Sequence, residues 1–303
     1  MESPTVEGYA PVPGGQVWYK IVGSGDALPL LTLHGGPSVG HDYLETLEGL
    51  ASDRPVVFFD QLGCGRSDKP ENVSLWRIER FVEEVAAVRK ALDLKRLHLY
   101  GHSWGGWLAI EYMLGKPTGV ASLTLGSTSA SSRQFVDELK PLRAALPQDV
   151  RETLERYEAL GDYHSPEYQK AVSAFQDPLF CRVRPVPEPL IRSGKILRES
   201  RAPYETIWGP NEFTATGNLQ DWERRDRLQE INVPTLVVCG WYDLCRPACS
   251  ESLHRGIPNS EMHIFEDCAH MAHLEEPESY VQVMREFLDR VERELVGRPA
   301  NMM

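Results

Sequence analysis

The stretch YGHSWGGW at residues 100–107 decides the fold that this sequence predicts. A strand pattern ends at Gly101, Ser103 stands at the turn, and a helical pattern begins immediately after it. This is the G-x-S-x-G pattern of a nucleophile elbow, a sharp strand-to-helix turn that exposes a serine hydroxyl at the edge of a sheet. Glycine suits positions 101 and 105 because side chains there would clash with the neighbouring strand and helix. We therefore predict that Ser103 is a nucleophile; the alternative is an ordinary glycine-rich turn.

Strand and helix patterns alternate on both sides of this turn. The strands are predicted at 16–22, 28–34, 55–60, 96–101, 120–126, 234–240 and 261–266. The helices are predicted at 77–94, from Trp104 to about Gly115, and at 277–295. Such alternation implies right-handed crossovers and a mostly parallel sheet covered on both faces, which is an α/β fold.

The interval from about Ser129 to Arg227 breaks this alternation. Helical stretches are predicted near 133–145, 148–160 and 166–175, followed by a proline-rich loop at 182–189. About a hundred residues without a convincing strand, inserted between two sheet strands, predict a helical cap domain. The predicted organisation is therefore a core formed by 1–128 and 229–303, with a cap at 129–228.

A serine hydroxyl needs a base to act as a nucleophile, and the base needs a group that orients it. In the α/β-hydrolase fold these partners follow in the order serine, acid, histidine, on loops at the same sheet edge. Asp243 follows the strand that ends at Gly240, and His270 follows the next strand. The other possible acid loop, GSTSASS after residue 125, has no carboxylate. We predict a Ser103–Asp243–His270 triad, with His273 as the rival base or else a supporting histidine.

The loop HGGPSVG at 34–40 follows a strand and predicts the second half of an oxyanion hole. Its glycines allow backbone N–H groups to approach a tetrahedral intermediate closely. We nominate the N–H of Gly36, with Gly35 as runner-up, together with the N–H of Trp104. His34 ends a strand directly, so a buried, hydrogen-bonded structural role is expected for it. Cys64, in the glycine-rich turn DQLGCGRSD, has no feature of a nucleophile.

Composition excludes several function classes. The formal net charge is −12, from 32 basic and 44 acidic residues, and it should repel nucleic acid and anionic membranes. No apolar run approaches the roughly 20 residues that span a bilayer, and the start, MESPTVEGYAPVPGG, lacks the pattern of a signal peptide. We expect a cytoplasmic protein that acts on a small molecule or short peptide and binds no nucleic acid or membrane. The sequence leaves its oligomeric state open.

Six cysteines are too few for a disulfide scaffold in a chain of 303 residues. Three of them lie close in sequence to two histidines, which raises the possibility of a zinc site: Cys245, Cys249, Cys268, His270 and His273. Their spacing, C-x3-C followed by C-x-H, matches no common zinc finger. We therefore expect no metal and no cofactor.

Taken together, these motifs resemble the proline iminopeptidase family of serine peptidases, which includes related amino-acid amidases. The match is carried by HGGPS at 34–38, DQLGCGRSD at 60–68, GHSWGG at 101–106, WGPNEF at 208–213, GWYD at 240–243 and CAHMAHLEEPE at 268–278. The resemblance implies an α/β-hydrolase core, a helical cap over the site, and cleavage of an N-terminal residue, often proline, from short peptides or amides. It implies the same triad and the same oxyanion hole as the residue pattern does.

The resemblance also implies that Glu212, inside WGPNEF, binds the free amine of the substrate; the alternative is a solvated residue of the cap. An ammonium in a dry pocket needs a charge partner. The chain departs from the family pattern at Leu244, where these peptidases often have a second glutamate, and at Ser38, where glycine is usual. The aromatic residues Trp208, Phe213 and Trp222 are candidates for the pocket wall or for the core.

The leading hypothesis is a serine aminopeptidase or amino-acid amidase that works through an acyl-enzyme. Leu244 leaves open an esterase or lactonase that acts on an uncharged substrate with the same triad. A third hypothesis is a binding protein or acyl-transfer enzyme that hardly hydrolyses, against which the intact triad argues. Epoxide hydrolases and dehalogenases of this fold use a carboxylate nucleophile, and position 103 is serine.

Overall fold

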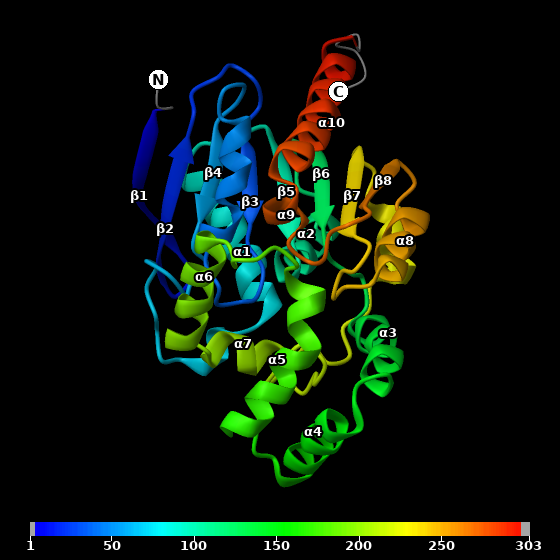
Figure 1. The fold of residues 1–303 in the computed structure, drawn as a ribbon. Coiled ribbons are helices and arrows are strands. Elements are labelled where there is room, and N and C mark those ends of the chain that lie inside the picture. The colour runs from blue at the N-terminus through cyan, green and yellow to red at the C-terminus, as the bar shows by residue number, and fades with distance from the viewer. Residues whose placement is uncertain (1–3, 298–303) are drawn as a thin grey trace.

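An eight-stranded sheet runs through residues 4–297, the part of the chain that the computed structural model describes (Figure 1). The strands are β1 Thr5–Val12, β2 Gly15–Val22, β3 Leu30–Leu33, β4 Val56–Phe59, β5 Leu97–His102, β6 Val120–Gly126, β7 Thr235–Gly240 and β8 Ser260–Phe265. Their order across the sheet is β1-β2-β4-β3-β5-β6-β7-β8. The pairs β1–β2 and β2–β4 are antiparallel, and all others are parallel. The predicted mostly parallel sheet is confirmed, and β1 is an addition to it.

Alternate residues of the central strands face opposite sides of the sheet, and both sides are buried. In β4, Val57 and Phe59 belong to one apolar cluster, while Val56 and Phe58 belong to the other. The first cluster packs against the helices α1 Ile78–Ala91, α2 Trp104–Leu114 and α8 Pro247–Gly256. The second packs against the 3₁₀ helix η1 Asp42–Leu50 and the helices α9 Ala272–Glu275 and α10 Pro277–Gly297. The sheet is thus a rigid layer between two helical layers.

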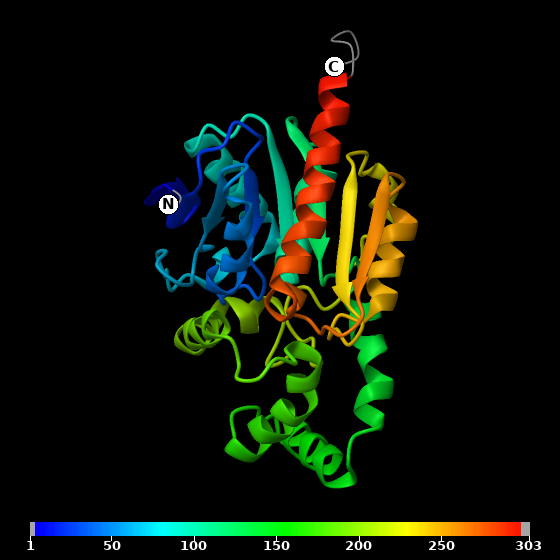
Figure 2. The same ribbon diagram turned by 45° about the horizontal axis from the view of Figure 1, so that its top comes forward.

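The chain between β6 and β7 is helical and lies at one end of the sheet (Figures 1 and 2). It contains α3 Ser132–Ala144, α4 Gln148–Leu160, α5 Pro166–Phe180, α6 Glu188–Glu199, α7 Ala202–Ile207 and the 3₁₀ helix η3 Arg225–Glu230. The first three helices begin where the sequence predicts them, and two of these starts are fixed by serine caps. Ser131 accepts a hydrogen bond from the Gln134 N–H, and Ser165 accepts one from the Tyr168 N–H. Because β6 leads directly into this segment, it covers the carboxyl edge of the parallel strands.

The proline-rich stretch at 182–189 is only partly the predicted loop, since α6 begins at Glu188. Pro187 is the residue before the first turn and Pro189 lies within that turn, where a missing N–H costs nothing. No helix within residues 4–297 has the length and apolar character needed to cross a membrane. The outermost parts of the predicted core, residues 1–3 and 298–303, lie outside the described residues.

Candidate active site

Ser103 occupies a strained turn between β5 and α2. Its backbone has φ 56° and ψ −122°, a conformation that a residue with a side chain rarely adopts. The turn is held by the Ser103 N–H, which donates to the Gly126 carbonyl at 2.9 Å, and by the Thr128 hydroxyl, which donates to the Ser103 carbonyl at 2.8 Å. A Cβ at Gly101 would collide with the Gly105 carbonyl, and one at Gly105 would collide with the Leu33 carbonyl. The tight turn therefore requires both glycines.

The loops after β7 and β8 bring Asp243 and His270 into contact. His270 Nδ1 lies 2.6 Å from Asp243 Oδ1, and the Cys245 N–H donates to the same oxygen at 2.7 Å. Burial alone would lower the pKa of His270, but the adjacent Asp243 carboxylate, together with the negative charges of Glu212 and Glu275, outweighs it, so the pKa is raised. Because Nδ1 binds the carboxylate, Nε2 is the ring nitrogen left for proton transfer. His270 and Ser103 line the same cavity.

Both loops are attached to the carboxyl end of α5. The Leu179 carbonyl accepts the Leu244 N–H at 2.9 Å and the His270 N–H at 3.2 Å. The Phe180 carbonyl accepts the N–H of the next residue, Met271, at 3.1 Å. These backbone acceptors leave no signal in the sequence, and sequence reasoning missed them. They fix the loop with the acid and the loop with the base to one point of the helical segment.

The two candidate oxyanion donors from the loop after β3 differ in their hydrogen bonds. The Gly35 N–H donates to the Tyr43 hydroxyl at 2.6 Å, and this hydroxyl lies 3.0 Å from His102 Nδ1. The Gly36 N–H makes no hydrogen bond within residues 4–297, and Gly36 lines a cavity together with Ser103. The Trp104 N–H is in the first turn of α2, where backbone donors have no partner within the helix. The Gly36 and Trp104 donors are therefore the available pair.

Gln61 connects the two elements that carry these donors. Its side-chain amide donates to the His34 carbonyl at 2.9 Å and accepts the Trp104 indole N–H at 2.8 Å. Its backbone N–H donates to His34 Nε2 at 3.0 Å, which leaves His34 Nδ1 to donate to the Gly35 carbonyl at 2.8 Å. Burial lowers the pKa of His34 to about 4, so the ring is neutral. The predicted structural role of His34 is confirmed, whereas Gln61 was not predicted.

The other histidine and cysteine candidates are buried, and among them Cys245 also lines a cavity beside Ser103. His273 Nε2 donates to the Tyr43 carbonyl at 3.0 Å, and burial lowers the pKa of His273 to about 3. All six cysteines are buried free thiols. Burial and nearby carboxylates raise the pKa of Cys64 well above its usual value. Within residues 4–297, no group of His, Cys, Asp and Glu side chains has an arrangement suited to a metal ion.

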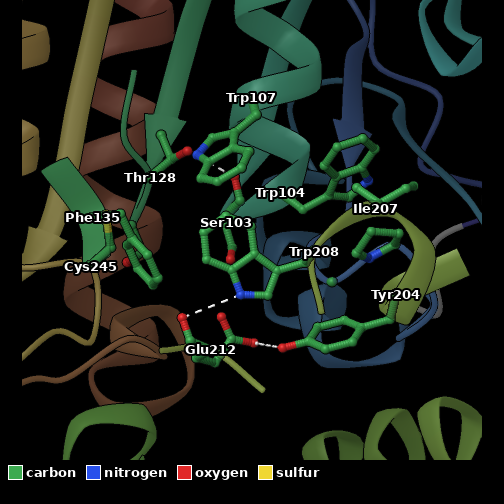
Figure 3. Close-up of a pocket in the computed structure, with 13 residues that line it drawn as sticks. Ser103, Trp104, Trp107, Thr128, Phe135, Tyr204, Ile207, Trp208, Glu212 and Cys245 are labelled. Carbon is green, nitrogen blue, oxygen red and sulfur yellow. Dashed lines mark hydrogen bonds between the residues drawn. The ribbon is translucent and has the colours of Figure 1, made fainter. Parts of the chain in front are cut away.

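Two cavities meet at Ser103. The first has a free volume of about 40 Å³ and an aromatic wall formed by Trp107, Phe135 and Trp208 (Figure 3). The second has a free volume of about 260 Å³ and is walled by α5, α6 and the loop that carries His270. Four residues line both cavities: Gly36, Ser103, Tyr204 and Glu212. The predicted nucleophile and the predicted amine-binding residue therefore share the junction.

Among the residues that the structure describes, Glu212 is the one acidic side chain in the wall of the first cavity. The Tyr204 hydroxyl donates to Glu212 Oε1 at 2.6 Å, and the Trp208 indole N–H donates to the Glu212 carbonyl at 3.2 Å (Figure 3). Burial raises the pKa of Glu212, although the Tyr204 hydrogen bond acts in the opposite direction. Leu244 is fully buried and lines neither cavity. Glu212 thus faces the first cavity without a second carboxylate from the described residues.

The aromatic candidates separate into wall and core. Trp208 lines the first cavity, which is the first of the two predicted alternatives, pocket wall or core. Phe213 packs edge-on against Phe175, and Trp222 stacks on Trp107 with ring centroids 4.9 Å apart. Trp222 therefore supports the wall residue Trp107 from behind, Phe213 packs against α5, and neither of the two lines a cavity.

Comparison with known proteins places the chain among hydrolases. The sequence model of the alpha/beta hydrolase fold family matches residues 29–277. A proline iminopeptidase of Heyndrickxia coagulans is 41% identical over 286 residues, which cover 94% of this chain and 99% of that protein. A proline iminopeptidase of Lactobacillus helveticus is 39% identical over 291 residues, with 94% and 98% covered. The crystal structure of proline iminopeptidase from Mycobacterium smegmatis superposes with a TM-score of 0.88 at 34% identity and covers 96% of this chain and 100% of that one.

Proposed function

Because the chain belongs to the proline iminopeptidase family within the alpha/beta hydrolase fold, we propose that it removes N-terminal proline from short peptides and amides through an acyl-enzyme. The observation that carries this proposal is the first cavity, which joins Ser103 to Glu212 between aromatic walls. The rings of Trp107, Phe135 and Trp208 offer an apolar surface for the ring of an N-terminal proline. Glu212 offers a negative charge for its amine in the same cavity. Together they favour a small apolar N-terminal residue with a free amine.

In the proposed mechanism the Ser103 oxygen attacks the carbonyl carbon of the scissile amide while His270 accepts the hydroxyl proton. The carbonyl oxygen becomes an oxyanion and accepts hydrogen bonds from the Gly36 and Trp104 N–H groups. His270 then gives its proton to the leaving nitrogen, the C–N bond breaks, and a prolyl ester of Ser103 remains. Water, deprotonated by His270, attacks that ester and releases free proline and the Ser103 hydroxyl. Asp243 holds the ring and stabilises its charged form throughout.

Glu212 is the proposed partner of the substrate amine. A protonated proline nitrogen brought into this pocket loses its water and needs a negative charge beside it. The carboxylate is already oriented by Tyr204, so little side-chain freedom is lost on binding. Binding of a cation would in turn lower the raised pKa of Glu212 and favour its charged form.

We also propose that residues 129–228 act as a cap domain between the core segments 1–128 and 229–303. Supporting this, helices of that segment contribute wall residues to both cavities: Phe135, Tyr204 and Ile207 to the first, and Leu190 and Leu197 to the second. A substrate at Ser103 would be enclosed by them. Enclosure limits the substrate to short peptides and amides.

A cytoplasmic location is part of the proposal. It is supported by the six free thiols, three of which are in neighbouring positions on and near α8 and β7: Cys239, Cys245 and Cys249. A reducing compartment preserves such thiols, whereas an oxidising one promotes pairing.

Hydrolysis of L-prolyl-, L-alanyl- and L-phenylalanyl-p-nitroanilide, each with and without an N-acetyl group, tests the proposed function. We expect the prolyl compound to react fastest and acetylation to abolish its turnover, because the acetyl group removes the charge that Glu212 binds. Ser103→Ala should be inactive on every substrate. Activity on p-nitrophenyl acetate alone, lost in Ser103→Ala, would replace the proposal with an esterase or lactonase.

A further inference from the structure

We infer that the second cavity is the leaving-group subsite and that it selects substrates in which the residue after the N-terminal proline is large and apolar. The inference rests on the proposed function and extends it to the other side of the scissile bond. Its evidence is separate, because it comes from the walls of the 260 Å³ cavity.

The position of His270 decides which cavity receives the leaving group. The base that deprotonates the serine must next protonate the leaving nitrogen, so the leaving group lies on the histidine side. His270 lines the second cavity and is absent from the wall of the first. Ser103 and Glu212 border both cavities, so an N-terminal residue in the first directs the rest of the substrate into the second.

The walls of the second cavity are mostly apolar. Phe180 stacks on the His270 ring with centroids 5.4 Å apart, and Met271 follows it in the loop. Val186, Leu190 and Leu197 line the cavity from the proline-rich segment and α6. The free volume is about 260 Å³, several times that of the first cavity. A leucine or phenylalanine side chain would lose its contact with water here, which favours its binding.

The charged groups of this cavity lie at two places. Glu212 stands at the junction of the two cavities and His270 in the wall of the second, while Asp177 and Arg184 are exposed. Arg184 donates to the Cys181 and Val183 carbonyls and forms no ion pair within residues 4–297. The apolar lining residues offer no charge partner: Phe180, Val186, Leu190, Leu197 and Met271. A charged side chain that lies against them loses water without compensation and binds less well than an apolar one.

The test compares kcat/KM for proline release from four amides: L-prolinamide, Pro-Gly-amide, Pro-Leu-amide and Pro-Asp-amide. L-prolinamide has ammonia as its leaving group, so it reports the proposed function without filling the second cavity. We expect Pro-Leu-amide to exceed Pro-Gly-amide by roughly tenfold to a hundredfold, the range typical of a few methylene groups in an apolar pocket. Pro-Asp-amide should also react more slowly than Pro-Leu-amide, because its charge loses water against the apolar wall.

Two wall variants and one control make the test specific. Leu190→Ser and Val186→Ser should each lower the ratio of kcat/KM for Pro-Leu-amide to kcat/KM for Pro-Gly-amide several-fold. Val186 is 37% exposed, so its replacement does not endanger folding. Leu160→Ser is the matched control, because Leu160 is 71% exposed on α4 and lines neither cavity.

The outcomes separate the two proposals. Cleavage of L-prolinamide with equal kcat/KM for the Gly and Leu amides would overturn the leaving-group subsite and leave the proposed function standing. The subsite would be overturned in the same way if both wall variants kept the leucine preference of the unmodified enzyme. No proline release from any of the four amides would refute the proposed function itself.

Discussion

Replacing Gln61 by methionine tests whether the Gln61 side chain holds together the two elements that carry the oxyanion donors, the loop after β3 and the start of α2. Methionine has nearly the length and volume of glutamine but cannot donate to the His34 carbonyl, and its thioether is only a weak acceptor for the Trp104 indole N–H. Gln61 is fully buried, so water cannot take over the lost partners without rearrangement. The substitution thus leaves the His34 carbonyl unpaired in the core and the Trp104 indole N–H at best weakly paired.

The expected loss follows from these two groups. Each buried polar group without a partner costs about 1–3 kcal/mol, so the free energy of unfolding should fall by about 2–6 kcal/mol. Against a total of about 5–15 kcal/mol this is large but survivable. The Gly36 and Trp104 donors would also lose their fixed spacing, and displacement of a reacting group by about 1 Å lowers rates by about a hundredfold. We expect kcat to fall by roughly tenfold to a hundredfold, with KM almost unchanged because Gln61 lines neither cavity.

Urea unfolding and steady-state kinetics on L-prolyl-p-nitroanilide measure the two effects. Gln220→Met is the matched control: Gln220 is exposed, and its side chain makes no hydrogen bond within residues 4–297. An unchanged kcat in a Gln61→Met enzyme that is destabilised as expected would refute the link to the oxyanion hole. An unfolding free energy within about 0.5 kcal/mol of the parent would refute the hydrogen-bond argument as well, because that is the range of neutral surface substitutions.

Further predictions concern the acid–base pair, the amine site and the elbow. Because the pKa of His270 is raised, kcat/KM should fall on acidification through a pKa above the usual value near 6.5, as a pH–rate profile would show. Asp243→Asn should move this acidic fall in kcat/KM to lower pH and reduce kcat by about 10³–10⁴-fold. Glu212→Gln should reduce kcat/KM on free-amine prolyl substrates at least about tenfold and leave p-nitrophenyl acetate hydrolysis unchanged; equal losses on both would exclude amine binding by Glu212. Gly105→Ala should prevent stable folding, because the added Cβ would collide with the Leu33 carbonyl. In Gly194→Ala, within α6, the added Cβ would meet only the flexible Arg198 side chain, so a thermal or urea melt should show an unfolding free energy higher by about 0.5–1 kcal/mol.

The buried strands and the first three helices between β6 and β7 could be predicted because their patterns are local. β1 escaped prediction because it is an edge strand with exposed residues and contains Gly8 and Pro11, which weaken a strand pattern. The start of α6 was hidden by prolines, which break a helix interior but suit its first turn.

For the site, chain order was enough to pair Asp243 with His270, since residues after neighbouring parallel strands meet at one edge. The supporting contacts of Gln61, Tyr43 and Leu179 join segments far apart in sequence. They depend on side-chain-to-backbone or backbone bonds across the fold, which no periodicity records. Pocket walls were predictable only in part for the same reason: Trp208 lines the cavity, Trp222 packs behind the wall residue Trp107, and Phe213 packs against Phe175 in α5.

The end of α5 has a mechanical consequence. Since one carbonyl, that of Leu179, anchors both the Asp243 loop and the His270 loop, any swing of α5 away from the sheet would pull on the acid and the base together. A molecule opened in this way would present Ser103 without an aligned proton acceptor, and it would be inert toward folded proteins and long chains that enter only such an opened state. If substrate instead enters by movement of α6 and α7, this anchor stays intact. We therefore expect the enzyme to react only with molecules small enough to be enclosed, so that the backbone bonds that build the site would also protect other proteins from it.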